Sequence, residues 1–225
     1  MVLITKNKNK RTKVTSYLYE LSNKVKLIHI QNPATIDFSL TVIIKSGASY
    51  EDMEKVPHGT AHLLEHILFK PNSKFQSDDE IHTFEEGTRK RPSMYINGRT
   101  NFKTIQLIGW ANQEATNRVI ERIKSLVEFP YYIFDKYFET EKNIVLAEKT
   151  QLPKQEKDKT IQLLKFLQEK ELPEFSYAVI GEVGDIQRIT LKDLESFFKS
   201  RFVTENVTIA TQSPSKLNKE IIGLL

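Results

Sequence analysis

Hydrophobic and polar residues alternate along several short stretches of this chain, and turn-forming residues bound each stretch. A period of two is typical of a strand with one buried face. The stretch 36–45 shows it most clearly, because Phe38, Leu40, Val42 and Ile44 fall on one face. The strands predicted in this way cover residues 14–21, 25–30, 36–45 and 207–210.

A further pair of strands is predicted at residues 93–97 and 100–109, on either side of the dipeptide Asn97-Gly98. Asn and Gly readily adopt the positive φ angles that two-residue hairpin turns require. The pattern therefore predicts a hairpin that turns at Asn97 and Gly98.

Longer stretches carry apolar residues three or four positions apart, and several of them end at a proline. This spacing is typical of amphipathic helices. Thr190 and Asp193 supply an N-cap and an acidic first turn for one of them. The order of strands and helices predicts an α+β fold, with helices packed on one face of a single mixed, largely antiparallel sheet. The predicted helices cover residues 58–69, 77–87, 112–129, 134–152, 159–171, 191–202 and 215–224.

Residues 1–13 are polar and basic, and we expect them to form a flexible arm before one domain that covers residues 14–225. The formal net charge is +4, and the excess is concentrated in this arm and at Arg89-Lys90-Arg91. A solvated arm and a basic loop account for this charge. A nucleic-acid surface would need a longer basic stripe or interleaved aromatic residues, and the sequence has neither.

The sequence contains no cysteine, so any zinc site must be built from histidine and carboxylate groups. The N-terminus lacks the apolar segment of a secretory signal, and no apolar run approaches the length of a membrane span. We therefore expect a soluble, cytoplasmic protein with no membrane or nucleic-acid partner.

The candidate chemistry lies in the predicted helix 58–69, where His62 and His66 are four residues apart. At this spacing both imidazoles project from one helix face and can bind one metal ion. Glu65 lies beside that face, where a carboxylate can act as a general base on a metal-bound water. The order His-x-x-Glu-His is that of the inverted zincins. The histidines would otherwise be ordinary polar helix residues, but the apolar stretch around them favours a partner for each ring.

A third metal ligand has to come from another element, and the segment Glu141–Glu148 of the predicted helix 134–152 offers two candidate acids. Glu141 and Glu148 are seven residues apart, so they lie two turns apart on the same face. Ile144 and Val145, between them, indicate partial burial. The pattern leaves open which acid binds the metal, or whether both face solvent.

Seven segments occur in the same order as in a known family, and the similarity runs from about residue 14 to residue 212. They are Lys45-Ser46-Gly47 with Glu51, Gly59–Lys70, Asn97–Thr100, Glu141–Glu148, 176–181, 190–198 and 201–210. Together they resemble the pitrilysin/insulinase family of metallopeptidases, which includes mitochondrial processing peptidase. Gly98 stands where that family usually has alanine, and we expect this exchange to loosen the strand.

The resemblance implies a role for each residue that matches a family motif. His62, His66 and Glu148 would be the zinc ligands. Glu65 would be the general base, and Glu141 would be a second acid that supports the site through hydrogen bonds.

The resemblance also implies where the substrate binds. Asn97, Gly98, Arg99 and Thr100 would begin an edge strand that binds the backbone of a peptide by strand addition. This mode reads little side-chain sequence, so broad specificity for unfolded peptides is expected.

Family members resemble two or four copies of such a domain closed around a chamber, and this chain matches one copy. In the family the facing domain supplies an arginine and a tyrosine to the site. We therefore expect a zinc-dependent endopeptidase completed by a second half-domain, in a homodimer, in a heterodimer with a non-catalytic sibling, or within a longer chain. The alternative is a peptide-binding subunit that binds zinc but has no turnover without its partner.

Overall fold

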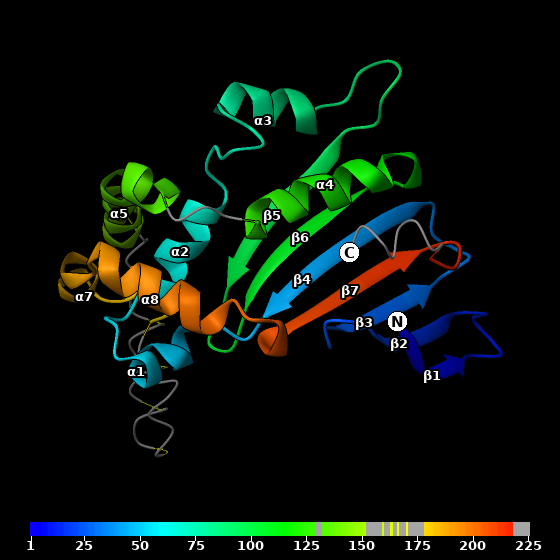
Figure 1. Ribbon diagram of the computed structural model, residues 1–225, viewed down its shortest axis with the longest axis horizontal. Helices are drawn as coiled ribbons and strands as arrows, with labels where there is room; N and C mark the ends of the chain where they lie inside the picture. Colours follow the sequence, from blue (N-terminus) through cyan, green and yellow to red (C-terminus); the bar gives the residue numbers. More distant parts are fainter. Residues whose placement is uncertain are drawn as a thin grey trace.

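The computed structural model describes residues 1–128, 132–151 and 178–217, and the single positions 159, 163, 166 and 170. In this part of the chain one sheet is accompanied by a set of helices (Figure 1). The strands are β1 Val2–Lys8, β2 Thr15–Glu20, β3 Lys26–Gln31, β4 Asp37–Ile44, β5 Met94–Thr100, β6 Ile105–Asn112 and β7 Val207–Ser213. The helices are α1 Glu51–Glu54, α2 Thr60–Leu68, α3 Asp78–Glu85, α4 Thr116–Val127, α5 Tyr132–Gln151, α7 Val183–Arg188 and α8 Leu191–Arg201, with 3-10 turns η1 Ala48–Tyr50, η2 Gln113–Ala115 and η4 Thr204–Asn206.

The strands form a seven-stranded sheet in the order β1-β2-β3-β7-β4-β6-β5. β3 and β7 are parallel, and every other neighbouring pair is antiparallel. The predicted mixed, largely antiparallel sheet of an α+β fold is therefore confirmed. Because β5 ends the sheet, it offers an edge to which another extended chain can be added.

The core forms where α4 crosses the face of β4 and β6 (Figure 1). Along β4, buried and half-buried positions alternate strictly, as the sequence predicted, and Phe38, Leu40 and Ile44 are almost fully buried. Val119 and Ile123 of α4 pack into the same core. This burial fixes the register of β4, because a slip by one residue would turn its apolar side chains to solvent.

A second group of helices lies beside the ends of the central strands (Figure 1). Helix α2 contacts α5 and α8 in this group, and it also contacts the edge strand β5. Helix α2 therefore joins the edge strand to the helical group, and this position determines which side chains surround its histidines.

The predicted turn at Asn97 and Gly98 is wrong. Both residues lie inside β5, and the chain turns after it, between Thr100 and Ile105. The side chain of Asn101 closes that turn, because its Oδ1 accepts hydrogen bonds of 2.8 Å from the N–H groups of Lys103 and Thr104.

The first 13 residues differ from the flexible arm that their charge predicted. Val2–Lys8 forms β1, which pairs with β2 and has an irregular register between Leu3 and Thr5. Asn9 closes the following turn, since its Oδ1 accepts the N–H groups of Arg11 and Thr12. Every residue of β1 is exposed, so the strand carries none of the alternation in burial that identified the others.

The remaining differences concern short or undescribed segments. Helix α7 was not predicted, because six residues are too few to show a helical period. The predicted helix 159–171 lies mostly outside the described residues, and so does 215–224, of which only the first three residues are described, outside any helix. Among the described residues, no helix combines the length and apolarity needed to cross a membrane.

Candidate metal centre

Helix α2 carries both histidines and is anchored by its apolar side. Ala61, Leu64 and Leu68 are completely buried on it. The helix starts after Gly59, whose φ of +96° is a left-handed conformation that side chains disfavour. A Cβ atom at Gly59 would also lie 2.5 Å from the carbonyl oxygen of Ile180, so only glycine fits at this helix start.

The two imidazoles lie against each other at the surface of α2. Their ring centroids are 4.7 Å apart, and the rings meet edge to face. The His62 and His66 side chains are 15% and 22% exposed. Burial, and then the neighbouring His66, lower the pKa of His62 to about 4, so this ring is neutral at pH 7. The His62 Nδ1 atom is buried and has no hydrogen-bond partner among the described residues.

Glu148, from α5, completes a group of three possible ligands. Its Oε2 atom lies 3.9 Å from His62 Nε2 and 3.6 Å from His66 Nε2. The three candidate ligand atoms all lie within 4.8 Å of one another, and this is the one such group among the described residues. Two imidazoles and one carboxylate are the ligand set of catalytic zinc sites that keep a fourth position open.

Glu141, also on α5, is much more buried than Glu148. Its side chain is only 3% exposed, and its Oε2 atom lies 3.5 Å from His66 Nδ1. Its Oε1 atom forms an ion pair of 2.9 Å with Lys70 Nζ. The structure therefore places Glu141 behind His66, on the ring nitrogen that faces away from Glu148. The role of Lys70 was not predicted, because its partner is 71 positions away in sequence.

The carboxylate of Glu65 rests against the edge strand. Its Oε2 atom accepts a hydrogen bond of 3.0 Å from the Thr100 hydroxyl. Burial raises the pKa of Glu65, and the hydrogen bond from Thr100 partly opposes this effect. A Cβ atom at Gly98 would overlap the Glu65 carboxylate and would lie 2.6 Å from the Phe69 ring. Gly98 therefore allows α2 and β5 to approach closely, a role different from the loosening of the strand that we expected.

The four residues predicted to bind substrate all lie on β5. Gly98 and Thr100 face Glu65, whereas Asn97 and Arg99 are exposed on alternate positions. The Asn97 side chain accepts the Gly98 N–H at 2.9 Å and donates to the Tyr95 hydroxyl at 2.8 Å. Strand β5 therefore contacts Glu65, which lies on the helix that carries the histidine pair.

Glu51 also supports the histidine helix, and sequence reasoning gave it no role. It is fully buried, and its Oε1 atom accepts the N–H groups of Gly59 at 3.1 Å and Ala61 at 2.8 Å. These are donors that the start of α2 leaves unpaired. Burial raises the pKa of Glu51 to about 8 against the effect of these hydrogen bonds.

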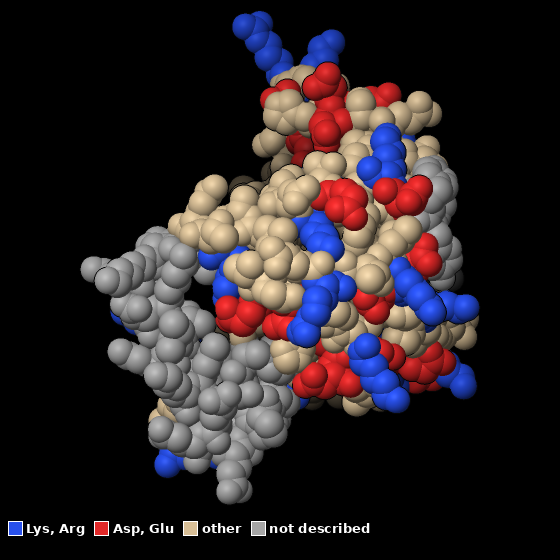
Figure 2. All heavy atoms as spheres, turned by 90° about the vertical axis from the view of Figure 1, so that its left-hand side faces the viewer, with Lys and Arg blue, Asp and Glu red and all other residues tan. Residues whose placement is uncertain are grey.

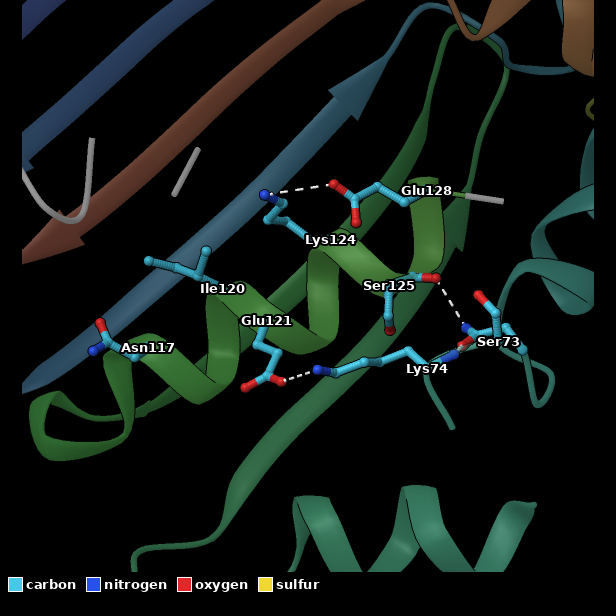
Figure 3. Close-up of a pocket in the computed structure, with 9 residues that line it drawn as sticks. Ser73, Lys74, Asn117, Ile120, Glu121, Lys124, Ser125 and Glu128 are labelled. Carbon is cyan, nitrogen blue, oxygen red and sulfur yellow. Dashed lines mark hydrogen bonds and ion pairs between the residues drawn. The ribbon is translucent and has the colours of Figure 1, made fainter. Parts of the chain in front are cut away.

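A hollow of about 410 Å³ lies beside α4 and is less suitable as a binding site for a charged ligand than the histidine centre (Figure 3). The Lys74 ammonium pairs with Glu121 at 2.6 Å, and the Lys124 ammonium pairs with Glu128 at 3.4 Å. The charges that line this hollow neutralise one another.

The face of the molecule in Figure 2 also has no large region, among its described atoms, in which all charged side chains have the same sign. Acidic and basic side chains are interleaved across its described atoms. This arrangement gives no support for a nucleic-acid surface there.

Comparison with known proteins finds a match to one peptidase family. Residues 26–169 match the family model described as Insulinase (Peptidase family M16). This match covers the positions of His62, His66, Glu141 and Glu148. No curated protein matches the chain.

Solved structures of similar fold include a protease from Helicobacter pylori (TM-score 0.70, 19% identity), an M16-like protein from Alicyclobacillus acidocaldarius (0.73, 15%) and pitrilysin (0.73, 17%). The matches cover 93%, 93% and 98% of this chain, but 48%, 48% and 23% of those chains. At these identities the likeness establishes the fold. The chain spans about half the length of the first two.

Proposed function

The chain belongs to the insulinase family of peptidases, family M16, and from this premise we propose that it is the catalytic half of a zinc-dependent endopeptidase. The observation that carries the proposal is the convergence of His62, His66 and Glu148 from two helices, beside an edge strand that can bind a peptide.

The residues present fit a zinc ion. His62 is neutral at pH 7, as a metal ligand must be. Its buried Nδ1 atom has no hydrogen-bond partner among the described residues, so the ring is not held in a hydrogen bond that would compete with a metal ion. Glu141 supports the His66 ring from behind at 3.5 Å, an arrangement that is frequent around metal-binding histidines. When bound, zinc would supply Lewis acidity that polarises a peptide carbonyl and lowers the pKa of a water molecule.

Glu65 would be the general base of the reaction. It would remove a proton from the attacking water as the water oxygen bonds to the peptide carbon. The same proton would pass to the amine nitrogen as the C–N bond breaks. A raised pKa suits this role, because it strengthens the carboxylate as a base.

The substrate would be an extended, unfolded peptide. Backbone groups of a peptide can pair with the edge of β5, and this pairing would carry the scissile bond past Gly98 and Thr100, where Glu65 lies. Folded proteins lack a free extended segment and would not be cleaved.

A second half-domain would complete the enzyme. The proposal follows from length, because the first two similar structures are about twice as long as this chain. A homodimer, a heterodimer with a non-catalytic sibling, or a longer chain of which this is one part would each provide it.

The test combines metal content with cleavage of a quenched fluorescent peptide. The purified chain is loaded with zinc, and its metal content and solution mass are measured on the same sample. Cleavage is then assayed at several protein concentrations, with and without chelator, and for Glu65→Gln. We expect one zinc per chain, cleavage that chelator abolishes, and loss of about 10²–10⁴-fold in Glu65→Gln with its zinc retained.

Two other outcomes separate the alternatives. Zinc bound at His62, His66 and Glu148 without cleavage at any concentration would favour the peptide-binding subunit that needs a partner for turnover. Cleavage that survives both chelator and Glu65→Gln would contradict a metallopeptidase.

A further inference from the structure

Arg99, at the edge of the sheet, is a cation that has no partner in the described part of the chain. It is exposed, and its guanidinium has no ion pair or hydrogen bond with any other described residue. Its two neighbours in β5, Gly98 and Thr100, are the residues that contact Glu65. The chain therefore places an exposed positive charge in the strand segment that contacts its candidate general base.

The register of β5 shows where this charge would meet a bound peptide. The Gly98 N–H bonds to the Asn97 side chain, so it points to the open edge of β5 and away from β6. Side chains alternate along a strand, and Tyr95, Asn97 and Arg99 therefore share the exposed face. A peptide paired to this edge would place every second side chain on that face, about 5 Å from these three residues.

An aromatic pair marks the other end of this face. Tyr95 and Trp110 are cross-strand partners, and their rings lie 5.8 Å apart. They are 47% and 48% exposed, so both rings are accessible from this face. The hydrogen bond from Asn97 to the Tyr95 hydroxyl holds the Tyr95 ring in place. This pair offers a fixed apolar surface four residues before Arg99.

We propose that the substrates of this site are extended peptides with an acidic side chain opposite Arg99, beside the scissile bond, and an aliphatic or aromatic side chain opposite Tyr95. The inference rests on the proposed function, because it takes β5 as the peptide-binding edge. It goes further by naming Arg99 and Tyr95 as residues that determine specificity. Arg99 attracts an acid and repels a base at one peptide position, and Tyr95 with Trp110 favours an apolar side chain four positions away.

The test uses a set of extended peptides of one length that carry Glu, Gln or Lys at each position in turn. Binding is measured first, by fluorescence anisotropy on the full, metal-free chain at low salt, where exposed charges are least screened. Cleavage of the same peptides is then measured on the zinc-loaded chain. At one position, wild type should prefer Glu over Lys by about threefold to tenfold, in line with cross-strand charge pairs.

Two charge reversals decide whether Arg99 is responsible. Arg99→Glu should invert the Glu-to-Lys preference at that position. Arg89→Glu changes the net charge equally on an exposed residue of the loop before β5, and it should keep the wild-type preference. Tyr95→Ser should weaken the preference for Leu or Phe over Ser, four positions away, by about threefold and leave the charge preference unchanged.

The outcomes distinguish this inference from the proposed function. Zinc-dependent cleavage with the same Glu-to-Lys ratio in wild type and Arg99→Glu overturns the inference and leaves the peptidase intact. An inverted binding preference without cleavage supports the inference and counts against turnover by this chain. No binding of any peptide overturns the inference, because it removes strand addition at β5.

Discussion

The hydroxyl of Thr100 donates a hydrogen bond of 3.0 Å to the carboxylate of Glu65. This bond joins the last residue of β5 to the helix that carries both histidines. It has two consequences, because it orients the candidate base towards the edge where a peptide would bind, and it lowers the pKa of a carboxyl that burial raises.

Thr100→Val removes this hydrogen bond with little change in shape. The pKa of Glu65 should rise further, because the charged form loses a donor, and the acidic limb of the kcat/KM profile should move to higher pH. Activity at the optimum should fall by roughly tenfold, the value of one hydrogen bond to a charged group. The matched control is Thr41→Val, in the middle of β4. A profile that keeps its acidic limb in Thr100→Val would show that the bond does not tune Glu65.

Removal of Glu148 should abolish tight metal binding. In Glu148→Gln only the two imidazoles remain as good ligands, and zinc affinity should fall by more than about 100-fold, beyond the usual cost of losing a supporting residue. Competition with a chelating dye measures the affinity directly. Glu139→Gln changes an exposed glutamate on the same helix and should bind zinc as wild type does. Equal affinities in all three proteins would remove Glu148 from the ligand set.

Local spacing in the sequence predicted the part of the candidate centre that lies on one helix. His62, Glu65 and His66 are one helix turn apart, so their proximity follows from the helix period. The choice between Glu141 and Glu148 depends on how α5 packs against α2, and the residues alone left it open. The family resemblance indicated Glu148, and the structure brings its carboxylate to both histidines. Lys70 and Glu51 were missed because each acts on a residue that only tertiary packing brings near.

Gly98 shows why a local signal can mislead. Asn-Gly favours a hairpin turn in isolation, but a Cβ at Gly98 would overlap the Glu65 carboxylate. The glycine is needed for the close approach of two elements, which no local pattern reveals. The alternating strand β4 was predicted well because burial of one face determines its pattern, and the fully exposed strand β1 was missed for the opposite reason.

The ion pair of Lys70 with buried Glu141 should contribute to stability. Lys70→Met leaves the Glu141 carboxylate without its cation, and the free energy of unfolding of the metal-free chain should fall by about 2–3 kcal/mol, because Lys70 is itself partly exposed. Urea denaturation measures this change. Lys74→Met breaks an ion pair whose members are both well exposed, and it should have little effect. Equal losses in the two variants would contradict a special role for the buried pair.

The buried carboxyl of Glu51 should make stability depend on pH. Its pKa is about 8 in the folded chain against an ordinary value of 4.5. Between these values the folded chain holds a proton that the unfolded chain has lost. The stabilisation is therefore complete below pH 4.5 and is lost as the pH rises through about 8.

The linkage between proton binding and folding limits how steeply the free energy of unfolding can fall with pH. One proton corresponds to at most about 1.4 kcal/mol per pH unit in the free energy of unfolding. The window from pH 6.5 to 8 is the most informative, because His62, whose pKa is lowered to about 4, contributes the opposite slope below pH 6.5.

Glu51→Gln should flatten this decline, since the amide oxygen can still accept the N–H groups of Gly59 and Ala61 but carries no titratable proton. Urea denaturation of the metal-free chain at several pH values gives the slopes. Glu114→Gln, at an exposed glutamate, should keep the wild-type slope. If wild type and Glu51→Gln lose stability in parallel across this window, Glu51 is ionised in the folded chain, and its two hydrogen bonds from the start of α2 outweigh its burial.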